Sequence, residues 1–162
     1  MIEYWIFSTP LGEAALVALP GAEPGLTVTY VLDYGHHYIR CQAHTAAATP
    51  ESFLRELAPA RTYVLRPEVD AFIKMGLGRG ATPQNTIVLE EDGATSAPLR
   101  FTDECARHKV LDLFGDLFLV GFPICARVIA FKSGHATNLK LVRAIREAFG
   151  EPARPAPEAT RP

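Results

Sequence analysis

The sequence predicts an α+β fold, a two-layer sandwich with helices packed on one face of a mostly antiparallel sheet. Several short segments alternate apolar and polar residues, which is the period of half-buried strands, and two later segments have apolar residues at helical spacing. A chain of 162 residues that is 48% hydrophobic can bury one compact core. We therefore expect one domain over residues 1–149 and a flexible tail over 150–162, which holds prolines and no large apolar residue.

The first part of the chain is predicted to consist mostly of strands. Two short strands over 2–7 and 14–19 are separated by a turn. Apolar residues at every second position, alternating with Thr27, Thr29 and Asp33, predict a strand over 26–32, and a turn at 35–37 joins it to a partner strand over 38–46. These last two segments are expected to form a β-hairpin.

Helices and strands alternate in the middle of the chain. Residues 49–51, Thr-Pro-Glu, start a short helix with a capping hydroxyl, a proline at the first position and an acid in the first turn. A strand is expected over 60–66, and Pro67 opens a helix that Gly76 ends. β-branched residues predict a further strand over 86–91.

Two longer helices enclose the last predicted strand. Thr102 or Asp103 is expected to cap the first helix, which should end at Gly121. A strand over 124–131 follows, and an amphipathic helix is predicted over 135–149.

Composition limits the binding partners and the cellular location that we expect for this chain. The net charge of −2 gives no general case for nucleic acid or an anionic membrane surface as a partner. Three cysteines without a CxxC pair argue against a disulfide framework, so a reduced, cytoplasmic setting is the simplest expectation. No signal-peptide pattern and no run of about 18 apolar residues occurs, so neither a signal peptide nor a membrane span is expected.

The helix predicted to begin after residue 103 has a face suited to metal chemistry. His108, Asp112 and Asp116 recur every fourth residue and span only about 80° of the helix. A histidine and an aspartate one turn apart suit zinc, and a further carboxylate can orient a neighbouring histidine. Ferrous iron accepts similar ligands, and a solvated polar face without a ligand is the alternative. The apolar residues predicted to fill the other side are Val110, Leu111, Leu113, Phe114, Leu117 and Phe118.

Three stretches in order carry a family resemblance. Residues 49–62 contain Thr-Pro-Glu-Ser-Phe-x-Arg-Glu-Leu-Ala-Pro-Ala-Arg-Thr. Residues 99–117 contain Leu-Arg-Phe-x-Asp-Glu-x-Ala-Arg-His-Lys-Val-Leu-Asp-x-x-Gly-Asp-Leu, and 132–138 contain Lys-Ser-Gly-His-x-x-Asn. Together they resemble the UDP-3-O-acyl-N-acetylglucosamine deacetylase (LpxC) family, the zinc amidases of lipid A synthesis. The resemblance covers roughly 26–149, matches 1–25 weakly, and is to the second, C-terminal domain of the family, whose fold it implies.

The resemblance implies zinc-dependent hydrolysis of an N-acetyl group to acetate and a free amine. His108 and Asp112 match the two zinc ligands that this domain contributes. His135 matches a histidine that stabilises the oxyanion or protonates the leaving amine, and Asp116 matches its carboxylate partner. Thr62 matches a threonine whose hydroxyl stabilises the oxyanion. From the residues alone, His135 could instead cap the last helix and Thr62 could be an ordinary strand residue.

Substrate contacts are also implied by the resemblance. Lys109 resembles a contact to a substrate phosphate, and Asn138 is expected to hold the site loop, although both could be solvated helix residues. The segment 72–85 corresponds to an insert that lines a passage for the acyl chain. The lining residues would be Phe72, Ile73, Met75 and Leu77, for which a place in the core is the alternative. The turn over 80–85, Gly-Ala-Thr-Pro-Gln-Asn, departs from the usual Gly-Gly-Ser-Leu-Asp-Asn of the family, which leaves the acyl-length preference open.

A local basic cluster could attract the nucleotide diphosphate of such a substrate. A charged helix exterior explains it almost as well. Its members are Lys132, Lys140, Arg143 and Arg146.

The resemblance also implies an incomplete enzyme. The first domain of the family carries a His-x-x-Glu-His motif that provides the third zinc-binding histidine and the glutamate base, and no such motif occurs in this sequence. The remaining histidines, His36, His37 and His44, lack a glutamate at that spacing, although one could be a substitute ligand. We expect the C-terminal half of a deacetylase that acts on a UDP-linked acylated amino sugar and needs the missing domain in cis or in trans. The alternatives are a non-catalytic module that binds the nucleotide sugar or its acyl chain, and a protein-interaction module.

Overall fold

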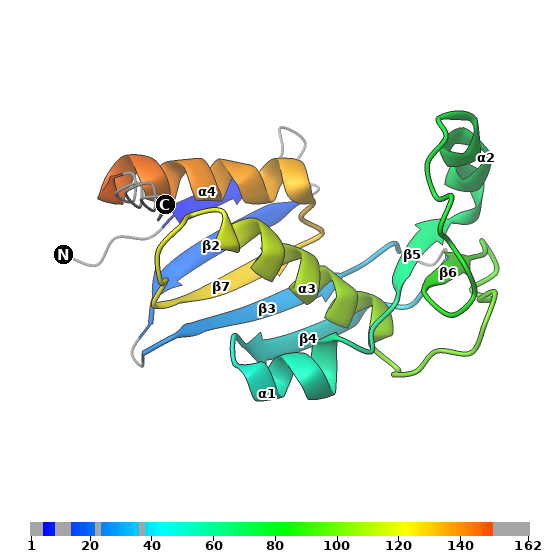
Figure 1. The fold of residues 1–162 in the computed structure, drawn as a ribbon, viewed down its shortest axis with the longest axis horizontal. Helices are drawn as coiled ribbons and strands as arrows, with labels where there is room; N and C mark the ends of the chain where they lie inside the picture. The colour runs from blue at the N-terminus through cyan, green and yellow to red at the C-terminus, as the bar shows by residue number, and fades with distance from the viewer. Residues whose placement is uncertain (1–4, 9–13, 22–23, 36–37, 151–162) are drawn as a thin grey trace, which may run out of the picture.

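The structure confirms the α+β class. The computed structural model describes residues 5–8, 14–21, 24–35 and 38–150. Its main element is a five-stranded sheet (Figure 1) in which β7 pairs with β3 in parallel and the other neighbours pair antiparallel. Its strands, in spatial order, are β1 (Trp5–Ser8), β2 (Ala15–Pro20), β7 (Ala126–Phe131), β3 (Leu26–Leu32) and β4 (Gln42–Ala47).

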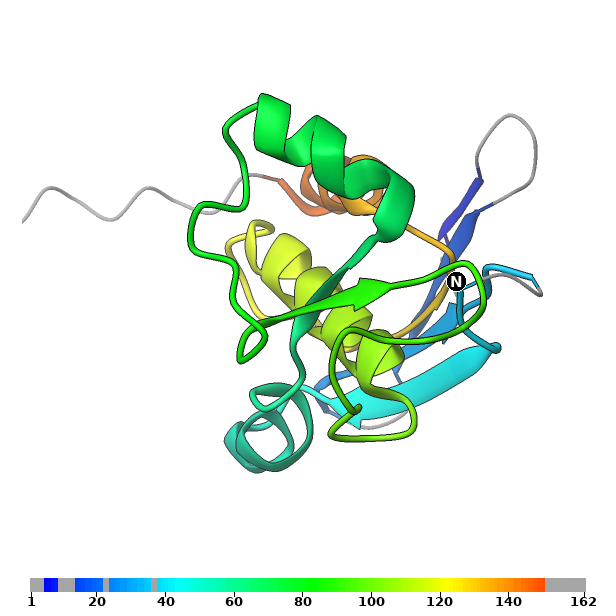
Figure 2. The ribbon, with the colours of Figure 1, turned by 90° about the vertical axis from the view of Figure 1, so that its right-hand side faces the viewer.

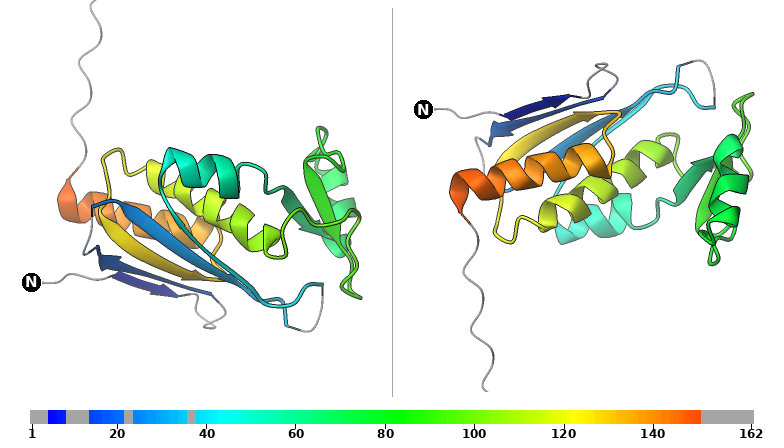
Figure 3. Two further views of the ribbon diagram at one scale, coloured as in Figure 1. Left: turned by 90° about the horizontal axis from the view of Figure 1, so that it is seen from below. Right: turned by 90° about the horizontal axis from the view of Figure 1, so that it is seen from above.

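Two long helices, α3 (Glu104–Phe118) and α4 (His135–Phe149), lie on one face of this sheet, as both views of Figure 3 show. A short helix, α1 (Pro50–Ser52), continues into a π-helical turn, η1 (Phe53–Leu57), that lies against α3. Alternation decides which strand residues enter the core, since every second residue of β3 is buried from position 28 onward. The largest fully buried side chains include Leu16, Val28 and Tyr30 from the sheet and Val110, Leu113, Leu117 and Leu141 from the helices.

A second, smaller unit projects from one end of the sandwich (Figures 1 and 2). It consists of β5 (Thr62–Leu65), α2 (Arg66–Lys74) and β6 (Thr86–Leu89), and its two strands are parallel. Parallel neighbours cannot be joined by a tight turn, so α2 forms the crossover between them. The sequence predicts these three elements but not their separation from the main sheet.

Several predicted elements are confirmed with small shifts. The helix over 135–149 and the strand over 26–32 have the predicted bounds, and the backbone N–H of Ser52 donates to the Thr49 hydroxyl at 3.2 Å, as the predicted cap requires. The partner strand of the hairpin begins at Gln42 rather than at residue 38, because Tyr38 has a φ of 62° and cannot continue an extended chain. His36 and His37, in the predicted turn, and the predicted tail beyond residue 150 lie outside the described residues.

The ends of α3 correct three expectations. Asp103 precedes the helix, but its carboxylate makes no capping bond and instead accepts from Arg107 Nε at 2.6 Å and pairs with His44 Nδ1 at 2.9 Å. The helix ends at Phe118 rather than at Gly121, because the chain tightens into i→i+3 bonds over the next three residues. Phe118, expected on the apolar side, is 86% exposed because no described element covers the last turn of α3 on that side.

Two negative expectations concern the chain as a whole. Cys41, Cys105 and Cys125 are free thiols, of which Cys105 is buried and the other two are exposed. Burial raises the pKa of the Cys105 thiol to about 12, so this thiol stays protonated and unreactive at neutral pH. None of the helices in the described part of the chain combines the length and apolar character that crossing a membrane requires.

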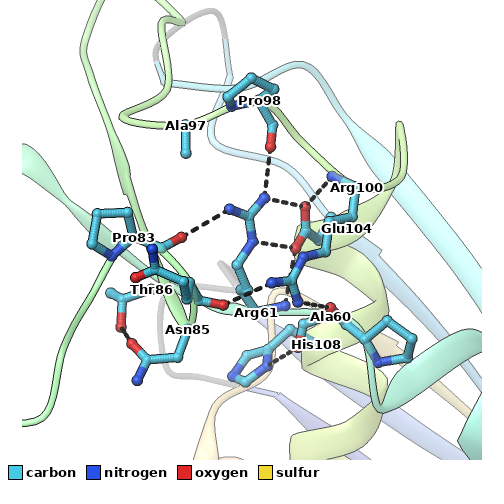
Figure 4. A network of polar contacts seen from close by, with 12 residues as sticks. Ala60, Arg61, Pro83, Asn85, Thr86, Ala97, Pro98, Arg100, Glu104 and His108 are labelled. Carbon is cyan, nitrogen blue, oxygen red and sulfur yellow. Dashed lines mark hydrogen bonds and ion pairs between the residues drawn. The ribbon is translucent and has the colours of Figure 1, made fainter.

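A buried ion pair joins the smaller unit to the first turn of α3 (Figure 4). The Glu104 side chain is fully buried and that of Arg61 is 5% exposed. Arg61 donates to the two carboxylate oxygens through Nε at 2.8 Å and Nη2 at 3.0 Å, and the backbone N–H groups of Arg61 and Arg100 donate to them at 3.0 and 2.6 Å. Burial would raise the pKa of Glu104, but these hydrogen bonds outweigh it and hold the pKa below its ordinary value.

Replacing the buried carboxylate should destabilise the fold strongly. In Glu104→Gln the Arg61 guanidinium stays buried without its counter-charge, so we expect a loss of about 3–5 kcal/mol in the free energy of unfolding, measured by urea denaturation. Glu90→Gln is the matched control, because Glu90 pairs with Arg66 in an exposed bidentate ion pair and its loss should cost far less. Equal losses in the two variants would contradict the role assigned to burial.

The stability that Glu104 contributes should depend on pH in one direction. Its pKa in the folded state lies below that of an unfolded chain, about 4.3, so the contribution is present above that pH and is lost as pH falls through the folded value. The difference in unfolding free energy between wild type and Glu104→Gln should therefore be constant above about pH 5.5 and shrink below about pH 4. A difference that stays constant down to pH 3 would contradict a depressed pKa.

Candidate functional site

The candidate metal ligands lie together on α3. His108 Nε2 is 3.5 Å from Asp112 Oδ1, and the two side chains are 17% and 21% exposed. His108 Nδ1 is 3.4 Å from the carbonyl oxygen of Ala60, a long hydrogen bond, and the Tyr63 ring packs edge-on against the imidazole at 6.4 Å between centroids. These contacts turn Nε2 toward the carboxylate.

The pair fits two ligands of one zinc ion. Nitrogen and oxygen ligands at about 2.0–2.1 Å from a tetrahedral zinc lie about 3.3 Å apart, close to the observed 3.5 Å. A carbonyl on the far nitrogen of the imidazole is the usual way to fix a zinc-binding tautomer. Lys109 Nζ donates to Asp112 Oδ2 at 2.8 Å, which leaves Oδ1 facing His108.

Among the described residues the candidate ligands number only two, His108 and Asp112. No group of three His, Cys, Asp or Glu side chains within the described ranges is placed to hold a metal ion. His44, one of the substitute ligands considered from the sequence, instead pairs through Nδ1 with Asp103 at 2.9 Å and lies 3.4 Å from Glu56 through Nε2. The described residues therefore place two candidate ligands together without a third.

A second pair forms where α3 meets the start of α4. His135 Nδ1 is 2.8 Å from Asp116 Oδ2, and Asn138 Nδ2 donates to the same oxygen at 2.8 Å. Asn138 is buried at 1% exposure, whereas the His135 side chain is 65% exposed. His135 does not cap the helix, since Gly134 holds the N-cap position and no side-chain cap is formed.

A hydrogen bond from the sheet fixes the loop over residues 132–134, which precedes His135. The Tyr30 hydroxyl, buried in the sheet, donates a hydrogen bond to the carbonyl oxygen of Ser133. Lys132 has a φ of 50°, so the chain turns sharply after β7 and enters α4 directly. The carbonyl bond and the Asn138 amide together place the imidazole of His135 beside α3.

Thr62 and His108 line a common pocket of about 640 Å³. Thr62 is exposed at the first position of β5, where Arg61 and the turn over 78–86 form the surrounding walls. Within that turn Asn85 accepts from the Thr82 N–H at 2.8 Å and donates to the Gly80 carbonyl at 2.9 Å. The asparagine that this turn shares with the family pattern therefore closes it, despite the changed residues before it.

The predicted acyl-chain residues lie on the surface, so the alternative that they form core is wrong. Phe72 is 38% exposed, Met75 61% and Leu77 54%, and α2 buries none of its residues. They offer apolar surface on the smaller unit.

The candidate phosphate contacts differ in their exposure to solvent and in their pairing with other side chains. Lys109, 15% exposed, is engaged with Asp112 and lies 5.9 Å from the centroid of the Tyr30 ring. Lys132, Lys140 and Arg143 are exposed around α4.

Our sequence-based predictions did not include the ion pair of Arg61 and Glu104. The only hint of it in the sequence is that both are charged residues within the matched motifs and that neither has an assigned role.

A larger hollow of about 850 Å³ lies at the other end of α3. Phe53, Phe118 and Phe122 contribute to its apolar walls, and none of its lining residues is charged. Its lining therefore holds no charged side chain, whereas the lining of the smaller pocket beside Thr62 includes Arg61, Arg100 and His108.

Comparison with known proteins agrees with this geometry. The family model described as UDP-3-O-acyl N-acetylglycosamine deacetylase (LpxC) matches residues 6–147. Three relatives, each named UDP-3-O-acyl-N-acetylglucosamine deacetylase, come from Leptospira biflexa serovar Patoc, Chlamydia caviae and Chlamydia trachomatis serovar D. They are 39%, 43% and 41% identical over 134, 134 and 139 residues.

These matches cover 83%, 82% and 85% of this chain but 44%, 47% and 48% of the relatives. The chain thus spans slightly less than half the length of the curated relatives it matches. A family match over most of the chain, with the motif residues gathered around one pocket and one helix, shows that this chain belongs to the LpxC family of UDP-3-O-acyl-N-acetylglucosamine deacetylases.

Proposed function

We propose that this chain is the C-terminal half of a zinc-dependent deacetylase that hydrolyses the N-acetyl group of a UDP-linked, acylated amino sugar in lipid A biosynthesis. One observation carries the proposal: the pair of His108 and Asp112 has the spacing of two zinc ligands and adjoins the pocket that holds Thr62. The pair of His135 and Asp116 supports it from the contact between α4 and the same helix α3.

Each residue has a task that follows from its placement. Zinc held by His108 and Asp112 would supply Lewis acidity and lower the pKa of a water molecule in its open position. The Thr62 hydroxyl would donate to the acetamide oxygen as negative charge develops there. Because His135 contacts Asp116 through Nδ1, its Nε2 is left to donate a proton to the leaving nitrogen.

The substrate would extend from the pocket in two directions. The apolar surface of Phe72, Met75 and Leu77 fits the acyl chain, since these side chains are exposed without a described partner element. Lys132 and the exposed basic residues of α4 fit the diphosphate. Lys109 would reach the substrate only by sharing its ammonium with Asp112.

The missing chemical groups belong, in this proposal, to a second domain that provides the third zinc ligand and the general base. Exposed apolar side chains near the hollow at the far end of α3 suit such a partner: Phe53 is 44% exposed, Leu54 68%, Phe118 86% and Leu119 54%. We place the assembled enzyme in the cytoplasm, where free thiols such as those of this chain persist.

Zinc titration of the chain alone tests the half-site. We expect weak one-to-one binding that His108→Ala or Asp112→Ala lowers at least tenfold, measured by competition with a chromophoric chelator. His135→Ala is the matched control, because the imidazole of His135 lies on Asp116 and should leave zinc affinity unchanged. Binding that is insensitive to His108→Ala would rule out the assigned ligands.

Reconstitution tests the activity. The chain mixed with, or fused to, the N-terminal half of a relative should release acetate from UDP-3-O-acyl-N-acetylglucosamine in a zinc-dependent manner. Thr62→Val should lower kcat by about 10²–10³, as loss of one oxyanion donor does. Thr45→Val is the control, since the Thr45 hydroxyl pairs with Thr29 on the main sheet. Zinc-independent binding of the nucleotide sugar without turnover would instead support the non-catalytic alternative.

A further inference from the structure

We infer that the buried pair of Arg61 and Glu104 is a positioning device for the site, which sets where Thr62 and the imidazole of His108 lie relative to each other and to the turn over 83–85. The inference rests on the proposed function, because it assigns Arg61 and Glu104 a role in arranging residues of that site. The two residues touch neither substrate nor metal in this account. They act through the backbone of the segment that they hold.

The first part of the argument is the pinning of this segment to α3. Glu104 and His108 are one helical turn apart, and each holds one of two consecutive residues (Figure 4). Glu104 accepts the backbone N–H of Arg61 at 3.0 Å, and His108 Nδ1 lies 3.4 Å from the carbonyl of Ala60. Thr62 follows immediately as the first residue of β5, so its position is fixed against the same two turns of helix.

The second part of the argument is that the Arg61 guanidinium also donates hydrogen bonds to two loops. Arg61 Nη1 donates to the Pro83 carbonyl at 3.1 Å and Nη2 donates to the Pro98 carbonyl at 2.7 Å. Arg100 adds a parallel link, with Nη1 on Pro59 O at 2.6 Å and Nη2 on Gln84 O at 2.8 Å. Ala60, Arg61 and Gln84 all line the pocket, so these bonds tie two separate segments of its lining to each other.

The third part of the argument explains why an ion pair, rather than apolar packing, joins this segment to α3. A buried ion pair is no more stabilising than well-packed apolar residues of the same volume, because the desolvation cost offsets the attraction. A guanidinium offers a planar fork of donors with fixed directions, which here meet Glu104, Pro83 and Pro98 at once. Apolar packing would hold the segment without fixing these directions, and a lysine ammonium could not span them.

The test compares two arginine-to-lysine variants of the complete chain without metal. Arg61→Lys keeps a positive charge but removes the fork, whereas Arg66→Lys makes the same change in the exposed pair with Glu90. The readouts are the imidazole nitrogen signals of His108 by ¹⁵N NMR, assigned against His108→Ala, and amide hydrogen exchange over residues 60–62 and 83–86.

In wild type and Arg66→Lys, His108 should show the same pair of imidazole nitrogen shifts. In Arg61→Lys we expect these shifts to change, amide exchange at least tenfold faster in both segments, and zinc affinity lower by about tenfold, the scale of lost outer contacts to a metal ligand. In the reconstituted enzyme kcat should fall while KM changes little.

Unchanged His108 signals and unchanged exchange in Arg61→Lys would overturn the inference and leave the pair a purely stabilising contact. Arg100→Gln gives an independent variant, because it keeps the ion pair intact and removes only the link between Pro59 and Gln84. It should speed exchange in the same segments. Failure of wild-type turnover would count against the proposed function alone, since the NMR and exchange results need neither metal nor partner.

Discussion

The carboxylate of Glu104 accepts four hydrogen bonds at the point where three parts of the chain meet. It lies in the first turn of α3, and its donors come from Arg61 just before β5 and from the backbone of Arg100. Within the unit of β5, α2 and β6, α2 buries none of its residues, so the junction and the buried Ile87 and Leu89 of β6 join the unit to the sandwich. Arg61 and Arg100, which donate to Glu104, also line the pocket beside His108.

Periodicity predicts the sandwich well because alternation and helical spacing report directly on burial. The strand at 26–32 and the helix at 135–149 have the predicted bounds for this reason. Local backbone conformations are not visible in such patterns. The left-handed Tyr38 delays β4, and the pairing of β5 with β6 in a sheet of their own depends on tertiary contacts.

The candidate site, like the fold, has features that the sequence predicts and features that only tertiary contacts determine. Helical spacing alone brings His108 and Asp112 together, and motif resemblance places His135 beside Asp116, where the structure also has them. The roles assigned to these residues remain predictions. Arg61 and Glu104 could not be paired from sequence, since 43 positions separate them and neither has periodicity that points to the other.

The proposed half-site on α3 has a thermodynamic consequence for assembly. If a second domain completes the zinc coordination, metal and domain bind to the same surface and their affinities are coupled. Coupling of this kind is reciprocal, so whatever factor the domain adds to zinc affinity, zinc adds to the affinity for the domain. Metal availability would then set the fraction of joined halves, and withdrawal of zinc would loosen the assembly as well as stop hydrolysis. Two ligands on one helix, His108 and Asp112, would in this way link the cell's zinc supply to quaternary structure.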